Sequence, residues 1–397
     1  MAYVHSPRTV TDGLVFFYDT GNTLKSYRGE PTTNLATDTP SQGGWPGSYT
    51  LIESSTKTFE LTTSSIPWGG TDAWTTFYYD VSEYTGQYIT ISAVFEYPLP
   101  SATGGTFNFM MIGQTVNTQT YLGYSGESDR NLKSTATRET VSWSGVIGDG
   151  GKVGIMIWMS ATAPAELTVR FSNIQVEAKP HATPFVNGTR SATQGLLDLT
   201  GNSTIDLTNV SFDSNAQMTF DGTDDTLEIP DTTVEDLTGD FTIENLVYLD
   251  SAENGSAAMI VSKRDSSDYT SPYHIYYEDR NNENSFRFAI GGGSSNYTST
   301  NSSNLNESVN TYSHVVSVVR GLTTEIYVNG ELKGSNTFTG TRQTNTRPAR
   351  IGGPYAYNSS NYLLTGEVPI TKIYNRALTA DEVQRNFNAV KSRFNIA

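Results

Sequence analysis

The stretch EIYVNGEL, residues 325–332, predicts a β-hairpin. Its two halves flank Asn329-Gly330, a pair that readily adopts the positive φ angles of a type I′ turn. Short apolar or aromatic segments, separated by clusters of Gly, Asn, Asp, Ser and Thr, recur at residues 14–18, 88–95, 153–159, 168–176, 241–249 and 314–319. Regularly spaced short strands of this kind predict an all-β fold built from β-sandwiches.

One helix is predicted, at the C-terminal end of the sequence. Thr379 is a good N-cap, and Glu382 stands three residues later, where the reciprocal partner of a capping box is found. Val383, Phe387 and Val390 then recur at helical spacing and form one apolar stripe. We expect the stripe to dock on a sandwich, with a partner-binding helix as the alternative.

Composition limits the classes of function. The chain has 397 residues, with 25 Lys and Arg against 41 Asp and Glu, and a net charge of −16. Such an acidic chain repels phosphate backbones, so we expect no nucleic-acid partner. The absence of Cys excludes disulfides and Cys-ligated zinc and fits folding in a reducing cytoplasm. Neither a secretion signal nor an apolar run of about 20 residues is visible, so we expect no membrane insertion.

Tryptophan is distributed unevenly along the sequence. All five Trp residues lie before residue 180, and the later half is rich in Asn, Ser, Thr and Tyr instead. This shift predicts two different domains. A connector is expected at residues 179–184, where two prolines favour extended backbone.

Residues 211–394 resemble the laminin G-like, concanavalin A-like jelly roll. Seven blocks carry the resemblance in the order of that family, and the first is MTFDGTDDTLEIP at residues 218–230. The others are residues 241–244, 260–263, 312–316, 325–331, 349–353 and 372–382.

Two further stretches resemble a narrower group, the virion proteins of tailed phages that carry this jelly roll. Residues 10–34 are similar to their opening, and residues 373–394 to their ending. The segment between opening and jelly roll is long enough for a domain, and its last strand, at residues 169–177, resembles the exit of galactose-binding-like sandwiches. The resemblance implies an all-β protein of two β-sandwich (jelly-roll) domains, one discontinuous, with a single short C-terminal helix. The expected domains are residues 1–33 plus 180–397, and an insert at residues 34–179.

The sequence gives no support for catalysis. The retaining glucanases of this fold place their acids on one face of a single strand. Residues 277–283 contain acids, but their Asn-rich middle predicts a turn, and residues 227–231 are interrupted by Pro230. We therefore expect no enzyme and no catalytic residue, and a polysaccharide hydrolase of this fold stays the second alternative.

One acidic cluster raises the question of whether the protein binds calcium. Asp221, Asp224 and Asp225 cluster in one predicted loop, and oxygen atoms are the ligands that Ca²⁺ prefers. The EF-hand order is absent, and residues 366–371, GEVPIT, lack the acidic pair that many members of the resembled family have there. We expect a solvated turn and no cofactor, with calcium as the alternative.

Aromatic residues in predicted loops are the candidates for carbohydrate binding, because sugars stack their apolar faces on aromatic rings. In the insert these are Trp45, Trp68 and Trp74, whereas Trp143 and Trp158 are expected in the core. In the jelly roll they are Tyr355, Tyr357 and Tyr362. The tryptophans could instead plug the ends of the sandwich, and the tyrosines could instead form subunit contacts.

The expected function is that of a phage virion structural protein on the particle surface, as capsid decoration, fibre or tail component. It would be assembled in the host cytoplasm and would contact host-surface glycans through sandwich loops. Its other expected partners are virion proteins and further copies of itself, as a trimer by analogy with phage fibres. The first alternative is a purely structural virion protein that binds no sugar.

Overall fold

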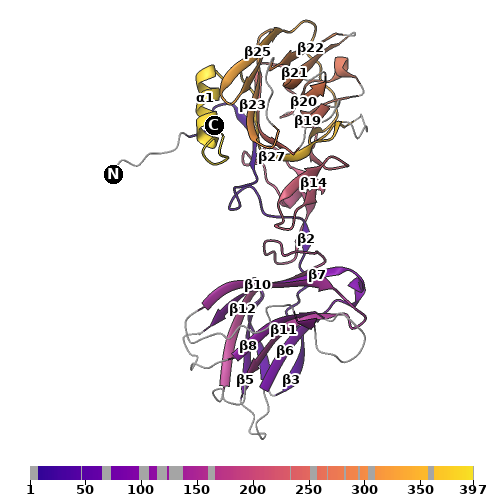
Figure 1. Ribbon diagram of the computed structural model, residues 1–397, viewed down its shortest axis with the longest axis vertical. Coiled ribbons are helices and arrows are strands. Elements are labelled where there is room, and N and C mark those ends of the chain that lie inside the picture. The colour runs from indigo at the N-terminus through magenta and orange to yellow at the C-terminus, as the bar shows by residue number, and fades with distance from the viewer. Residues whose placement is uncertain are drawn as a thin grey trace, which may run out of the picture. The chain divides into compact units, whose positions relative to one another are not determined.

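The structure is a computed structural model (Figure 1) that describes residues 8–45, 47–64, 73–97, 107–113, 123–124, 137–159, 166–232, 234–250, 257–265, 267–280, 283–293, 296–302, 309–355 and 362–396. The chain divides into two compact units. The jelly-roll unit comprises Met1–Glu30, Ala192–Asp213 and Gln217–Ala397, and the insert unit comprises Pro31–Ser191 with Ser214–Ala216. The all-β prediction is confirmed, and the domain boundaries predicted at residues 33/34 and 179/180 stay a prediction.

The jelly-roll unit contains two antiparallel sheets. The first has the order β15 (Ser211–Phe212), β16 (Met218–Asp221), β27 (Thr365–Tyr374), β18 (Phe241–Leu249), β23 (Tyr312–Arg320), β24 (Thr323–Val328) and β25 (Glu331–Thr337), and β1 (Leu14–Asp19) also pairs with β27. The second has the order β14 (Asp206–Asn209), β17 (Thr226–Ile229), β26 (Ala349–Ile351), β19 (Ala257–Ser262), β20 (His274–Arg280), β21 (Glu283–Gly293) and β22 (Asn296–Asn301). Short 3₁₀ turns lie at Ala192–Gln194 and Asp268–Thr270.

One buried cluster joins these two sheets. It includes Phe241 and Ile243 of β18 and Tyr277 and Phe288 of the second sheet, as expected for sheets packed face to face. The predicted hairpin is confirmed: β24 and β25 pair across Asn329 and Gly330, whose φ angles are 51° and 83°.

The two ends of the chain meet in the first sheet, since β1 pairs with residues 370–374 of β27 and Leu14 lies opposite Tyr374. The predicted helix is confirmed as α1 (Ala380–Val390), drawn in yellow in Figure 1, and its capping box of Thr379 and Glu382 is formed. Val383 of α1 packs on the outer face of this sheet, so the central strands β18 and β27 are buried on both faces.

A buried polar cluster lies under α1. The Lys372 Nζ atom donates to Glu244 Oε1 over 2.6 Å, the His314 Nε2 atom lies 3.1 Å from the same oxygen, and the Asn386 amide of α1 donates to Glu244 Oε2 over 2.6 Å. The Asn386 Oδ1 atom accepts the Val10 N–H. The side chains of Glu244 and Lys372 are only 1% exposed. We call Glu244, His314, Lys372 and Asn386 the helix anchor.

The insert unit is a sandwich of two five-stranded sheets. One has the order β10 (Thr137–Val146), β7 (Tyr88–Tyr97), β12 (Glu166–Glu177), β5 (Thr58–Ser64) and β4 (Gly47–Glu53). The other has the order β3 (Ser41–Trp45), β6 (Ala73–Asp80), β11 (Lys152–Met159), β8 (Phe107–Gly113) and β9 (Gly123–Tyr124). Phe59 and Phe171 of the first sheet and Phe77 of the second lie in one buried cluster. A two-residue pair, β2 (Thr32–Thr33) with β13 (Thr189–Arg190), and a 3₁₀ turn at Ser82–Tyr84 complete the unit.

Among the residues that the structure describes, no helix has the length and apolar character needed to span a membrane.

Candidate functional site

Two of the candidate tryptophans lie in strands. Trp45 ends β3 and Trp74 lies in β6, directly opposite each other in the register, so the prediction that they lie in loops is wrong. Their Gly-rich surroundings suggested loops, but backbone pairing in the sheet overrides local propensity. Trp68 lies outside the described residues. Trp143 of β10 is buried in the core, as expected.

The candidate tyrosines of the jelly-roll unit lie among arginines. Tyr355 is half-buried, and the guanidinium carbons of Arg347 and Arg350 lie 5.1 and 4.6 Å from its ring centroid. Tyr362 is also half-buried, and the guanidinium carbon of Arg264 lies 5.4 Å from its ring centroid. Tyr357 lies outside the described residues. A role of these tyrosines in sugar binding stays a prediction.

A cavity of about 520 Å³ opens in the jelly-roll unit, within the size range of small-ligand sites. It combines apolar side chains with amide and carboxylate groups, which is the mixture that a sugar ring and its hydroxyls require. The lining residues are Val15, Asn202, Val234, Asp236, Leu237, Thr238, Gly239, Asp240 and Asn375. They come from four segments far apart in the sequence. No sequence motif predicts that these segments lie side by side in the fold.

The wall of this cavity, residues 234–240, is held in place by ion pairs and backbone contacts. The side chain of Lys263 is fully buried, and its Nζ atom lies 3.1 Å from Asp236 Oδ1 and also binds Asp231. The Gly321 N–H donates to Asp240 Oδ1 over 2.7 Å. Because these contacts fix the loop before any ligand arrives, little ordering is needed on binding.

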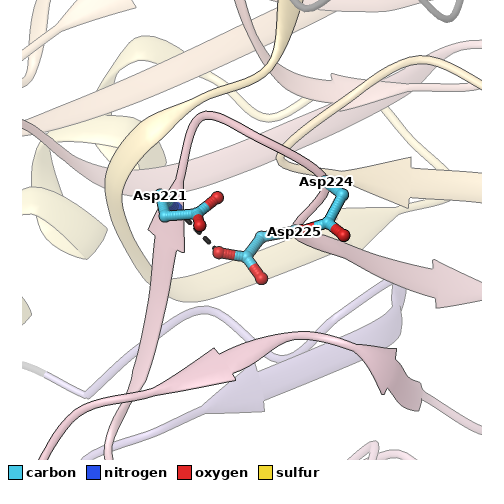
Figure 2. A group of neighbouring side chains, drawn as sticks. All are labelled: Asp221, Asp224 and Asp225. Carbon is cyan, nitrogen blue, oxygen red and sulfur yellow. Dashed lines mark hydrogen bonds between the residues drawn. The ribbon is translucent and has the colours of Figure 1, made fainter.

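The acidic cluster of Asp221, Asp224 and Asp225 is formed, with one oxygen of each carboxylate within 4.8 Å of the others (Figure 2). Asp225 is buried, and its two oxygens accept the backbone N–H groups of Ser211 and Asp221 over 2.7 Å each. Burial raises the pKa of Asp225 and outweighs the hydrogen bonds that lower it. The carboxylate of Asp225 thus ties the turn between β16 and β17 to the adjacent strand β15.

Glu228 and Glu278, two of the acids weighed for hydrolysis, lie in paired strands. Glu228 of β17 faces Arg350 across the strand pair, and Arg350 Nη2 lies 2.9 Å from its Oε2 atom. Glu278 of β20 forms an ion pair with Arg287 of β21. Each carboxylate therefore has a structural partner within its own sheet.

Comparison with known proteins supports the fold. Residues 221–384 match a family described as the concanavalin A-like lectin/glucanases superfamily. The chain therefore contains a concanavalin A-like, laminin G-like domain together with an additional β-sandwich. No curated protein matches the chain.

Several solved structures are similar in fold. The binding domain of Paraclostridial Mosquitocidal Protein 1 is 18% identical, with a TM-score of 0.39 and coverage of 49% of each chain. Domain 4 of AbnA, an arabinanase from Geobacillus stearothermophilus in complex with arabinotriose, is 16% identical, with a TM-score of 0.36 and coverage of 49% of this chain and 91% of that one. Trypanosoma rangeli sialidase is 16% identical, with a TM-score of 0.38 and coverage of 50% of this chain and 31% of that one. The chain thus spans about half of the first protein and about a third of the sialidase.

Proposed function

We propose that this is a glycan-binding structural protein of a tailed-phage virion, displayed on the particle surface, and that it binds without catalysis. The observation that carries the glycan part of the proposal is the cavity of the jelly-roll unit, which is lined by the polar residues Asn202, Asp240 and Asn375 together with apolar Leu237. Planar amide and carboxylate groups pair with neighbouring hydroxyls, and the apolar wall receives the face of a sugar ring.

The virion part of the proposal is supported by the resemblance of the two ends of the chain to tailed-phage proteins. These ends form one sheet through β1 and β27, and Asp19 of β1 binds Arg393, which follows α1. A closed jelly roll of this kind, without disulfides, suits a rigid element that folds in a reducing host cytoplasm and joins other virion proteins. Repeated copies on one particle turn weak sugar contacts into useful avidity.

Substitutions in the cavity test the glycan part. Asn375→Ala removes an amide, and Asp240→Asn removes a charge while keeping an acceptor for the Gly321 N–H. Losing one hydrogen bond to a sugar hydroxyl costs about 1 kcal/mol, so we expect each variant to bind immobilised host-envelope glycans about fivefold more weakly. The matched control is Asn209→Ala, an exposed amide on β14 away from the cavity lining.

Biolayer interferometry with the full chain measures these affinities. Binding that is unchanged in both cavity variants would contradict the assignment of the cavity. A folded chain that retains no host-envelope glycan would contradict glycan binding altogether and leave the purely structural role.

A further inference from the structure

The carboxylates that line the jelly-roll cavity are only partly neutralised by the protein. Asp236 and Asp240 both belong to the lining, and the buried Lys263 forms an ion pair with Asp236. Asp240 is exposed, and its Oδ1 atom accepts the Gly321 N–H over 2.7 Å. Among the residues that the structure describes, no Lys, Arg or His lies within ion-pair distance of Asp240. The charge of Asp240 is therefore left for a ligand to neutralise.

Arg342 lies near Asp240 but is held by the backbone. Its Nη1 atom donates to the Gly239 carbonyl over 3.0 Å, and its Nη2 atom donates to the Gly321 carbonyl over 2.8 Å. Its guanidinium carbon lies 5.2 Å from the ring centroid of Phe338. Burial lowers the pKa of Arg342, and the negative charge of Asp240 offsets part of that effect. Arg342 is not among the lining residues, so its guanidinium supports the wall of the cavity instead of meeting a ligand.

The amide nitrogen of Asn202 is already used within the protein. Its Nδ2 atom donates to the Val15 carbonyl over 2.9 Å and to Thr200 Oγ1 over 3.0 Å. Because a carbonyl oxygen can only accept, these bonds fix the orientation of the amide and leave its Oδ1 atom for a ligand. The Thr238 N–H likewise donates to the Asp236 carbonyl over 3.0 Å. These donors are therefore satisfied before any ligand arrives.

Acceptors predominate among the polar side chains of the lining. Ionised Asp236 and Asp240 can only accept, and Asn202 has its oxygen left, whereas Asn375 and Thr238 can both donate and accept. A ligand that mainly donates hydrogen bonds fits this set. Carboxylated or sulfated sugars would bring more acceptors and more negative charge to two carboxylates, so we expect the cavity to exclude them. Sugar hydroxyls and ammonium groups both donate, and an ammonium group also neutralises Asp240.

We propose that the glycan bound in this cavity contains an amino sugar with a free amine, whose ammonium group binds Asp240. This inference rests on the proposed function, because it specifies the class of sugar for the same site. A hydrogen bond between an ammonium group and a carboxylate is about twice as strong as one between neutral groups. The net charge of −16 also attracts cationic ligands towards the chain. N-acetylation of the amine removes its charge and therefore both effects.

Calorimetric titration of the full chain compares two ligands that differ in acetylation, the β-1,4-linked trisaccharides of glucosamine and of N-acetylglucosamine. The titration is made at physiological ionic strength and at a pH below the pKa of the glucosamine amine but above that of an ordinary aspartate, so that both partners are charged. We expect the glucosamine trisaccharide to bind about tenfold more tightly than the acetylated one.

Two substitutions change the charge of the cavity in opposite directions. Asp240→Asn keeps an oxygen for the Gly321 N–H and is expected to weaken binding of the glucosamine trisaccharide about tenfold. Asn375→Asp adds a carboxylate to the lining and is expected to strengthen that binding about threefold. The matched controls, Asp224→Asn and Asn209→Asp, make the same charge changes at exposed positions outside the lining. Because salt screens distant charges, each control is expected to change binding by less than about twofold.

The outcomes distinguish this inference from the proposed function. If the glucosamine trisaccharide does not bind, or binds no more tightly than the acetylated one, the amino-sugar assignment is wrong. Equal effects of Asp240→Asn and Asp224→Asn would also overturn it, because the attraction would then come from the net charge of the chain. In each of these cases the proposed function still stands if Asn375→Ala weakens binding to host-envelope glycans.

The opposite combination is equally informative. Binding of the glucosamine trisaccharide that is weakened by Asp240→Asn and strengthened by Asn375→Asp would support the amino-sugar site, even if immobilised host-envelope glycans do not bind. That result would contradict only the host surface as the source of the glycan.

Discussion

Replacing Lys372 with methionine is expected to lower the free energy of unfolding by about 3–5 kcal/mol. Lys372 lies in β27 directly opposite Glu244 of β18, and both side chains are excluded from water. The methionine keeps much of the apolar stem but removes the cation, so Glu244 is left as a buried carboxylate without its strongest partner. Glu244 also accepts a hydrogen bond from Asn386 of α1. Removing the Lys372 cation is therefore expected to weaken the packing of the helix on the sheet as well.

Urea unfolding of the full chain, followed by circular dichroism, measures this effect. The matched control is Lys333→Met, which breaks the exposed pair of Lys333 with Glu331 and is expected to leave the unfolding midpoint nearly unchanged, because solvent screens such a pair. The double variant Glu244→Gln with Lys372→Met is expected to be more stable than Lys372→Met alone, since it leaves no unpaired buried charge. An unchanged unfolding midpoint for Lys372→Met would contradict the structure of the helix anchor.

Low pH is expected to destabilise the protein through the same helix anchor, because Glu244 becomes protonated. Burial opposes the charge of Glu244, but attraction to Lys372 and the contact with His314 prevail and hold its pKa at about 2, against 4.5 for an ordinary glutamate. A carboxyl with a depressed folded pKa contributes stability that is complete above its unfolded pKa. The unfolded chain binds more protons between the two values, so that stability is lost as pH falls from about 4.5 towards 2.

The expected loss over this window is about 3 kcal/mol from Glu244. Glu382, whose hydrogen bond with Arg376 holds its pKa at about 2, adds to the loss in the same window. Unfolding measured at several pH values between 6 and 2.5 tests this. Glu244→Gln is expected to be less stable at pH 6 and to show a shallower dependence on pH. If the stability of Glu244→Gln depended on pH as steeply as that of the wild-type chain, groups other than Glu244 would be responsible for the loss of stability in acid.

The helix and the strands could be predicted because their signals are local. Thr379, Glu382 and the apolar stripe of α1 lie within a few turns of one helix, and the turn at Asn329-Gly330 needs only its own two residues. Asn386 shows the limit of this reasoning. It lies on the buried side of α1. Nothing near it in the sequence distinguishes it from an ordinary polar residue, because its partner Glu244 is 142 residues away.

The candidate sites depended on register, which composition does not reveal. Gly43 and Gly44 beside Trp45 are typical of a loop, yet the whole segment pairs with β6. Trp74 likewise lies in a strand, β6, and its place in the fold follows only once the strand bounds are known. The cavity around Asn202 and Asn375 could not be predicted from the sequence for a related reason, since only the closed jelly roll brings its segments together.

The most direct test of the proposed function is to label intact, purified phage particles with an antibody raised against this protein and to view them by electron microscopy. The proposal predicts label on the particle surface, and its position on the capsid or on the tail distinguishes a decorating role from a host-recognition role. Intact particles that bind no label, while the antibody recognises the purified chain, would contradict the proposal that this is a displayed virion protein.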